Sequence, residues 1–459
     1  GVRLVGSEMC IRDSNKAISE LEGIKGYIYN PAMKYLLLAY NYQMKLQFLD
    51  KKKVLKSEDF KKAHKFYMIA LYEGKDNIRV KASILSNLSF LHQSAGNHSI
   101  ATNFFKKRSQ LPFVNSEAQL AFYWQYSRSL FYASDYSEAA IQSEQALKLI
   151  KKQKLRHYQA PFTERSAFYA MNAREFKKAK KHYQKLFRSY DNKLKPKQKA
   201  KAKLAFGFTL MNLKEKKRAV SAFKDSINIT RTLKPEAASK GKTLAFHPSR
   251  LRILAYGFLA KLSPSEDGKI NYRLSRIQEF RTIMDKAQSL GTKKGVIQAS
   301  IIKDHNIVAD TYIKMNKTIE GQKALESAIM EAKDWSENAG DPYSIPAFRS
   351  LVNYMSFAVA NSSQAPKDVH EGLESMFKNA KTSYEELKSP APMQTYQFLK
   401  LKILWTAFQV KQGTAGEQGS FKAEMAQVFK KATATDLKSK MKPRYSELIS
   451  LKNGLSNAL

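Results

Sequence analysis

The chain has 459 residues and a formal net charge of +39, and 43% of its residues are hydrophobic. That hydrophobic share excludes a fully disordered polymer, and no apolar run approaches the roughly 20 residues that a membrane-spanning helix needs. The excess charge comes mainly from lysine, which favours contact with acidic partners but carries no information about fold.

The first segment, residues 1–14, is set apart from the rest of the chain. Its sequence, GVRLVGSEMCIRDS, resembles the translation of sequencing-adapter DNA, so we expect it to be non-native and the native N-terminus to be missing. The single cysteine, Cys10, lies inside it, so the remainder offers no thiol for a disulfide, a nucleophile or a metal. Because the native N-terminus is expected to be missing, both a cytoplasmic and an exported or periplasmic location fit the sequence.

From residue 30 the chain reads as successive pairs of amphipathic helices. Asn30 and Pro31 predict a helix start, with asparagine as the cap and proline in the first turn. Five pairs place an alanine at the same point of their second helix. These anchor alanines are Ala63, Ala101, Ala139, Ala179 and Ala219. Their spacing, about 38 to 40 residues by subtraction, predicts a repeat of helical hairpins.

The regular pattern breaks at 233–250, which is rich in Lys, Ala, Gly and Pro and is expected to be a linker or irregular connection. Further helix pairs follow, and no stretch alternates convincingly as a strand. The predicted organisation is a non-native segment 1–14, a basic N-terminal array 15–232 of about five hairpins, the connection 233–250, a C-terminal array 251–439 of about four divergent hairpins, and a capping helix 440–459.

The second helices carry Ala-x3-aromatic-x2-Ala or close variants of it, and the first helices carry a small residue near the middle. The stretch 203–226, KLAFGFTLMNLKEKKRAVSAFKDS, is an example, with Gly207 on one helix and Ala219 and Phe223 on the other. This pattern resembles the tetratricopeptide repeat (TPR) family. The resemblance implies an all-α fold, an α-solenoid of about eight to nine antiparallel hairpins in a right-handed superhelix. The family's tryptophan and its closing proline are mostly missing, so the repeats are divergent.

Short motifs that signal catalysis are missing from the sequence. We find no metal-ligand spacing, no P-loop and no Gly-x-Ser-x-Gly elbow, and the eight histidines are scattered. We therefore predict that the chain is not an enzyme and needs no metal and no cofactor.

The resemblance implies a groove along the first helices, in which a peptide or a helix of another protein binds. The side chains that we expect in this groove are Asn87, Tyr126, Tyr169 and Phe208. Asn87 lies in the run SNLSFL, which is similar to the helix that supplies an asparagine in carboxylate-clamp members of the family. That clamp needs further basic residues on the next first helix, where Ala121 and Gln125 stand, so we expect it to be incomplete.

A basic block between residues 151 and 234 predicts a patch for an acidic partner. The lysines assigned to this patch are Lys177, Lys178, Lys180, Lys181, Lys195, Lys197, Lys199 and Lys201. An acidic protein segment, an anionic lipid or glycan, and nucleic acid all fit such a patch, although arginine is scarce and no base-reading motif is present, so specific nucleic-acid binding is not expected. A purely solvated face is the other interpretation.

These patterns together predict a non-catalytic scaffold for protein–protein interaction. Two alternatives stay open. The chain could be the sensory or regulatory part of a larger protein, such as a transcription regulator or kinase, whose N-terminal effector domain is missing. It could also be an exported scaffold in envelope assembly.

Overall fold

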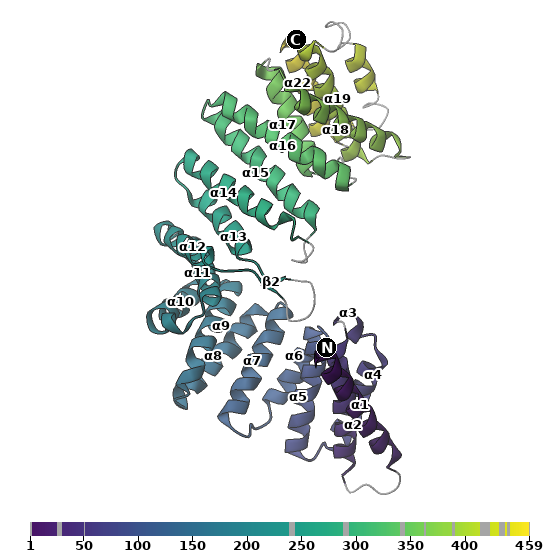
Figure 1. The fold of residues 1–459 in the computed structure, drawn as a ribbon, viewed down its shortest axis with the longest axis vertical. Helices are drawn as coiled ribbons and strands as arrows, with labels where there is room; N and C mark the ends of the chain where they lie inside the picture. Colours follow the sequence, from purple (N-terminus) through teal and green to yellow (C-terminus); the bar gives the residue numbers. More distant parts are fainter. Residues whose placement is uncertain are drawn as a thin grey trace. The chain divides into compact units, whose positions relative to one another are not determined.

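A computed structural model describes residues 2–24, 30–49, 51–237, 244–287, 293–339, 345–361, 364–387, 391–413, 423–430, 437 and 441–458. Within these ranges the chain is almost entirely helical (Figure 1), which confirms the predicted all-α fold. It divides into two compact units: unit 1 holds residues 1–195 and 209–215, and unit 2 holds 196–208 and 216–459. No helix of the described chain is long and apolar enough to cross a membrane.

Unit 1 is built from consecutive helices that pack in pairs. The elements are α1 (Val2–Gly23), α2 (Pro31–Lys45), η1 (Leu46–Phe48), α3 (Lys51–Val54), α4 (Glu58–Glu73), α5 (Ile78–Ser94), α6 (His98–Ser109), α7 (Ser116–Tyr132), α8 (Tyr136–Lys152), η2 (Arg156–Tyr158), α9 (Gln159–Asn172), α10 (Phe176–Tyr190) and η3 (Asp191–Lys193). Each first helix (α2, α5, α7, α9), here called an A helix, packs on the B helix that follows it (α4, α6, α8, α10). The B helices α4, α6 and α8 also pack on the A helix that comes next.

Caps at the helix starts follow the sequence. The side chain of Asn30 accepts a hydrogen bond from the backbone N–H of Met33, with Pro31 in the first turn, as predicted. Asn115 caps α7 in the same way through the N–H of Ala118. Each such bond satisfies one of the backbone donors that a helix start leaves without a partner.

The five anchor alanines are completely buried, with 0% of each side chain exposed. In four of the five pairs an aromatic residue follows the alanine at the fourth position. These aromatic residues are Tyr67, Phe105, Tyr183 and Phe223, and each is at most 1% exposed. The alanine lets two helices approach and the aromatic ring fills the space one turn further on, so the predicted small-then-large pattern is a core-packing pattern.

The turn from the A helix to the B helix has one backbone geometry in several hairpins. A residue in the left-handed region ends the A helix at Gly96 (φ 79°), Ser134 (67°), Arg174 (61°), Lys214 (61°) and Asn316 (59°). The next residue's N–H then donates to the carbonyl five residues earlier, at 2.8–2.9 Å, as Asp135 does to Leu130. This is the Schellman motif, so main-chain hydrogen bonds close these hairpins.

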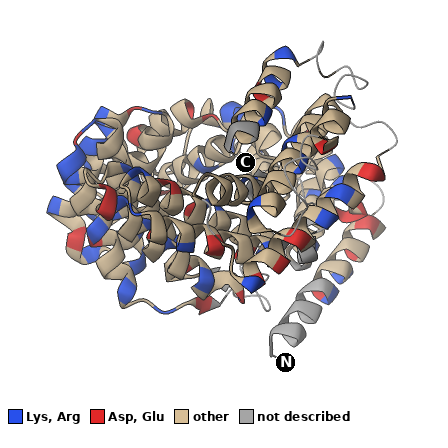
Figure 2. Ribbon diagram, turned by 90° about the horizontal axis from the view of Figure 1, so that it is seen from above, with Lys and Arg blue, Asp and Glu red and all other residues tan. Residues whose placement is uncertain are grey.

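Unit 2 continues the helical pairing. Its elements are α11 (Pro196–Asn212, of which 209–212 belong to unit 1), α12 (Lys216–Arg231), β1 (Glu236–Ala237), β2 (Leu244–Phe246), α13 (Pro248–Leu262), α14 (Glu266–Met284), α15 (Lys294–Lys314), α16 (Thr318–Ala339), α17 (Ile345–Asn361), α18 (Lys367–Glu385), α19 (Pro392–Gln412), a helical segment 423–430 and α22 (Lys442–Ala458). Consecutive helices from α12 to α17 pack on one another, and α22 packs on α19. Lysine and arginine lie on helices throughout the chain (Figure 2), as its charge requires.

The predicted connection 233–250 contains a short antiparallel ladder that the sequence did not predict. Glu236 pairs with Phe246 and Ala237 pairs with Leu244. The boundary between the two compact units falls within and around α11. The predicted division into arrays 15–232 and 251–439 stays a prediction, and so does the non-native origin of residues 1–14, where α1 runs through position 14 into 15–23.

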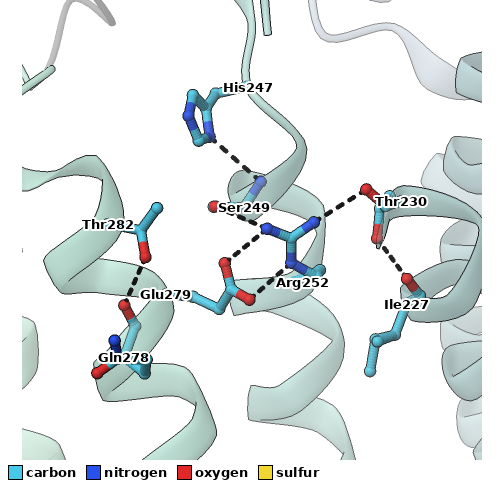
Figure 3. Close-up of polar contacts among 8 residues, drawn as sticks. All are labelled: Ile227, Thr230, His247, Ser249, Arg252, Gln278, Glu279 and Thr282. Atoms are coloured by element: carbon cyan, nitrogen blue, oxygen red, sulfur yellow. Dashed lines mark hydrogen bonds and ion pairs between the residues drawn. The ribbon is translucent and has the colours of Figure 1, made fainter. Parts of the chain in front are cut away.

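A largely buried ion pair joins α13 and α14, the two helices that follow this ladder (Figure 3). Arg252 on α13 donates from Nε and Nη2 to the two carboxylate oxygens of Glu279 on α14, at 2.6 and 2.9 Å. Its Nη1 donates to the carbonyl of Thr230 at 2.9 Å, and Nη2 also donates to Ser249 Oγ at 3.0 Å. One guanidinium therefore connects the last turn of α12 with α13 and α14.

Candidate functional site

The A helices of unit 1 leave one side accessible, and the side chains there form the candidate site. We call this surface the A-face. It consists of Asn87 on α5, Gln125, Arg128 and Tyr132 on α7, and Arg165 and Phe168 on α9. Tyr132 is 56% exposed and Phe168 is 38% exposed. Along each helix these residues recur three or four positions apart, the spacing of side chains that share one helical face.

Hydrogen bonds connect neighbouring A helices beside this surface. Gln93 on α5 donates to the carbonyl of Gln125 at 3.0 Å and to Ser129 Oγ at 2.8 Å, both on α7. Arg165 on α9 donates to the carbonyl of Trp124 on α7 at 2.7 Å. The A-face of these three helices is therefore held together by polar contacts between repeats.

Arg165 is held in a fixed orientation. Its guanidinium carbon lies 3.2 Å from the centroid of the Trp124 ring and 5.7 Å from that of Tyr169. Burial lowers the pKa of Arg165 from its ordinary value, yet the group stays charged because an arginine is effectively always protonated. Stacking on an indole is a favourable cation–π arrangement, so the charge sits at a defined point of the A-face.

Arg128 and the exposed aromatic rings lie close to this charge. The guanidinium carbon of Arg128 is 5.8 Å from the centroid of the Tyr132 ring. The Tyr132 ring stacks on His98 of α6, with centroids 4.8 Å apart. The ring of Phe168 lies 5.2 Å from that of Phe131 on α7. Each of these two exposed rings thus packs against another ring of the protein while part of its surface stays accessible.

Neither arginine of the A-face has an acidic partner in the part of the chain that the structure describes. Glu164 raises the pKa of Arg165 electrostatically, whereas the nearby charge of Arg128 lowers it. Two cations beside two open aromatic rings form a surface that suits a carboxylate or a backbone carbonyl next to an apolar side chain.

The predicted groove residues lie on the expected helices but differ in exposure. Tyr126 and Tyr169 are 5% and 4% exposed and pack in the core, and burial raises the pKa of Tyr126 to about 12. Asn87 is half-buried on α5. Phe208, in unit 2, is half-buried with its ring 5.6 Å from that of Phe258. A groove through these four residues stays a prediction.

The sequence analysis missed four residues of the A-face, namely Arg128, Tyr132, Arg165 and Phe168. Arg128 stands two positions after the predicted Tyr126, and Phe168 stands one position before the predicted Tyr169. The helical spacing on α7 could have indicated two of them. Arg128 and Tyr132 are four positions apart, on the side of the helix away from the buried Phe122, Tyr126 and Leu130. At the positions where a carboxylate clamp would need basic residues, Ala121 is exposed and Gln125 is half-buried.

The predicted basic patch is divided between the two units. Lys177, Lys178, Lys180, Lys181 and Lys195 belong to unit 1, whereas Lys197, Lys199 and Lys201 belong to unit 2. Several of these lysines bind acids: Lys178 pairs with Glu175 at 2.9 Å, Lys180 with Glu215 at 2.6 Å, and Lys197 with Glu236. As one continuous patch it stays a prediction.

No protein-family model matches the chain, and no curated protein matches it. Similar solved structures include the C-terminal part of a TPR repeat-containing protein from Cytophaga hutchinsonii, 13% identical over 66% of this chain and 98% of that chain, with a TM-score of 0.43. The apo form of RapI is 14% identical over 71% of this chain and 80% of that chain, with a TM-score of 0.42. YrrB, described as a TPR protein with an unusual peptide-binding site, is 14% identical over 48% and 93%, with a TM-score of 0.33. No ligand or function transfers at such low similarity, and the repeat architecture follows from this chain's own helix pairing.

Proposed function

We propose that the chain is a non-catalytic protein-interaction scaffold that binds a peptide or a helix of a partner protein on the A-face. The observation that carries the proposal is the pair Arg128 and Arg165, which have no acidic partner in the described chain and lie beside the exposed rings of Tyr132 and Phe168.

The arginine geometry suits a peptide acceptor. A guanidinium has five N–H donors, and the hydrogen bond to the Trp124 carbonyl uses one of those on Arg165. Because stacking on Trp124 already fixes this side chain, less side-chain entropy is lost when a ligand binds. The ligand that fits is a carboxylate, either an acidic side chain or a chain terminus, or a main-chain carbonyl.

The aromatic rings supply the second part of the recognition. Tyr132 and Phe168 expose large rings whose other sides pack on His98 and Phe131. At protein interfaces, aromatic residues and arginine are among the residue types that contribute most to the binding energy. We infer that the partner segment places an apolar side chain against these rings and an acceptor group near the arginines.

A regulatory module and an exported scaffold would use the same surface, since both act by binding another protein. Either role therefore depends on the same binding step.

Peptide display against the full chain tests the proposal. Selected peptides are titrated by fluorescence anisotropy against the wild type, Arg128→Ala, Arg165→Lys and Phe168→Ala. We expect each variant to weaken binding by about tenfold, the equivalent of about 1.4 kcal/mol. Arg165→Lys keeps the charge but loses the planar stack, so it separates geometry from net charge.

Gln145→Ala on α8 is the matched control, because Gln145 is exposed on a B helix of the same unit. Circular dichroism confirms that each variant is folded. Selection of no peptide at all, or of peptides that bind every A-face variant as well as the wild type, contradicts the proposal.

A further inference from the structure

Unit 1 carries a second charged surface, formed by the outward sides of two neighbouring B helices. His182 Nε2 on α10 lies 3.5 Å from Glu144 Oε1 on α8, which places these helices next to each other. Lys148 and Lys152 on α8, and Lys177, Lys181, Lys185 and Arg188 on α10, are all exposed. We call these six residues the basic face, and Figure 2 draws such cations in blue.

Within α8, α10 and the chain between them, no exposed acid accompanies the basic face. Between residues 136 and 195, all of which the structure describes, the acidic residues are Glu138, Glu144, Glu164, Glu175 and Asp191. Each of them is half-buried and none is exposed. Glu144 contacts His182 and Glu175 pairs with Lys178, so each of these two carboxylates already has a partner outside the basic face.

Helix formation does not account for the lysines of α10. The first turn of this helix contains no acid, and Lys177 stands there, although the positive end of the helix dipole disfavours a cation at that place. Lys177, Lys181 and Lys185 also follow one another at intervals of four, where like charges repel. By contrast, Lys148 and Lys152 lie toward the C-terminus of α8, where the dipole favours them. The row on α10 therefore reduces helix stability and calls for another explanation.

We propose that the basic face docks on a bilayer that contains anionic lipids. Five of its six cations are lysines, which act as single point charges, whereas the planar fork of arginine suits bidentate recognition of a particular carboxylate or phosphate. A bilayer attracts a cluster of cations through its negative surface potential and needs no individual hydrogen-bond geometry. From Lys177 to Arg188 the row extends about 16 Å along the helix, so it reaches several headgroups at once.

Two further observations favour a bilayer over other polyanions. Ile141 on α8 is 45% exposed and stands in the same row as Gln145 and Lys148, and a headgroup region accepts an apolar side chain among lysines. In addition, no aromatic residue of α8 or α10 is strongly exposed, so no ring is available for the base stacking that proteins use on single-stranded nucleic acid. An acidic peptide has a better site on the A-face, where the arginines lie.

Vesicle co-sedimentation of the full chain tests this proposal. The vesicles contain phosphatidylcholine alone or phosphatidylcholine with about 30% phosphatidylserine. The test variant is Lys177→Glu/Lys181→Glu/Lys185→Glu. The control variant is Lys367→Glu/Lys378→Glu/Lys381→Glu on α18, which changes the net charge by the same amount at exposed positions of unit 2.

We expect binding to the anionic vesicles only, weakened by added salt, and reduced about tenfold or more in the test variant while the control variant keeps most of it. Glutamate near the start of a helix is favourable, so the test variant is expected to fold; circular dichroism checks this, and Lys→Gln at the same three positions repeats the test without charge reversal. An equal loss in both triple variants, no binding to the anionic vesicles, or tighter binding of duplex DNA or a polyglutamate peptide at the same salt concentration overturns the proposal.

Discussion

A Cβ atom added to Gly207 on α11 would lie 2.6 Å from Cε1 of Phe223 on α12. The two helices therefore meet with a bare backbone on one side and an aromatic ring on the other. Phe223 is completely buried, and it follows the anchor residue Ala219 by one turn. The sequence 203–226 predicted that the backbones of these two helices lie close together. They do, and this closeness depends on the lack of a side chain at position 207.

Gly207→Ala is expected to destabilise the chain, because the new methyl group must displace a buried ring and overpacking of this kind costs about 1–3 kcal/mol. The free energy of unfolding is measured by urea denaturation. Gly372→Ala is the control: its added Cβ would meet atoms no closer than 3.5 Å, so the better helix propensity of alanine should stabilise α18 by up to about 1 kcal/mol. Equal effects of the two substitutions would show that the close contact is not the cause.

Glu279→Gln is expected to reduce the free energy of unfolding by about 3–5 kcal/mol, because it leaves the guanidinium of Arg252 largely buried without its charge partner. The two side chains are 15% and 16% exposed. The double variant Arg252→Met/Glu279→Leu should recover much of this loss, since it removes both charges together. A double variant as unstable as the single one would mean that the bonds of Arg252 to Thr230 and Ser249 carry the effect.

Stability is expected to fall in weak acid through buried histidines. Burial lowers the pKa of His92 and of His305 to about 4, below their ordinary value of 6.5. The folded state thus binds fewer protons than the unfolded state between pH 6.5 and 4, so their contribution is complete above pH 6.5 and is lost as the pH falls toward 4.

His305→Phe isolates this effect, because neither ring nitrogen of His305 has a hydrogen-bond partner among the residues that the structure describes. Between pH 6.5 and 4 the variant should gain stability relative to the wild type, by up to about 3 kcal/mol. The comparison is made by chemical denaturation at each pH. A constant difference between variant and wild type across this range would contradict the assigned protonation.

Arg174→Gly is expected to stabilise the chain by up to about 1 kcal/mol, because Arg174 holds a left-handed conformation that disfavours a side chain. Glycine adopts it freely, although its greater freedom in the unfolded chain offsets part of the gain. Gly96→Ala is the opposite test at the equivalent turn, where we expect a loss of about 1 kcal/mol. Thermal unfolding of both variants checks the pair, and the same sign of effect in both would refute the shared geometry.

The sequence predicted the features that repeat. Both the anchor alanines and the cap at Asn30 could be recognised from a few neighbouring residues. In the structure the five alanines are buried and the Asn30 side chain caps its helix. Which side chains of the A helices face the core was harder to predict. The sequence analysis named Tyr126 and Tyr169 for a groove, which stays a prediction, and the structure buries both rings. A large aromatic residue on an amphipathic helix fits either side, and the choice depends on the neighbouring repeat, which single-helix periodicity does not reveal.

Two other features lay beyond sequence reasoning for different reasons. The β1–β2 ladder involves only two and three residues, too few for an alternating pattern. The left-handed turns contain serine, arginine, lysine and asparagine as well as glycine, so the residue type that usually marks this conformation is mostly missing.

Those turns have a consequence for how such a chain changes over generations. Because main-chain hydrogen bonds close these five turns, their side chains can be exchanged at the cost of a modest strain while the turn is kept. The amino-acid sequence of such turns can therefore diverge while the hairpins are retained. In this chain five different residue types occupy the same turn position, so the repeat is clearer in the backbone than in the sequence.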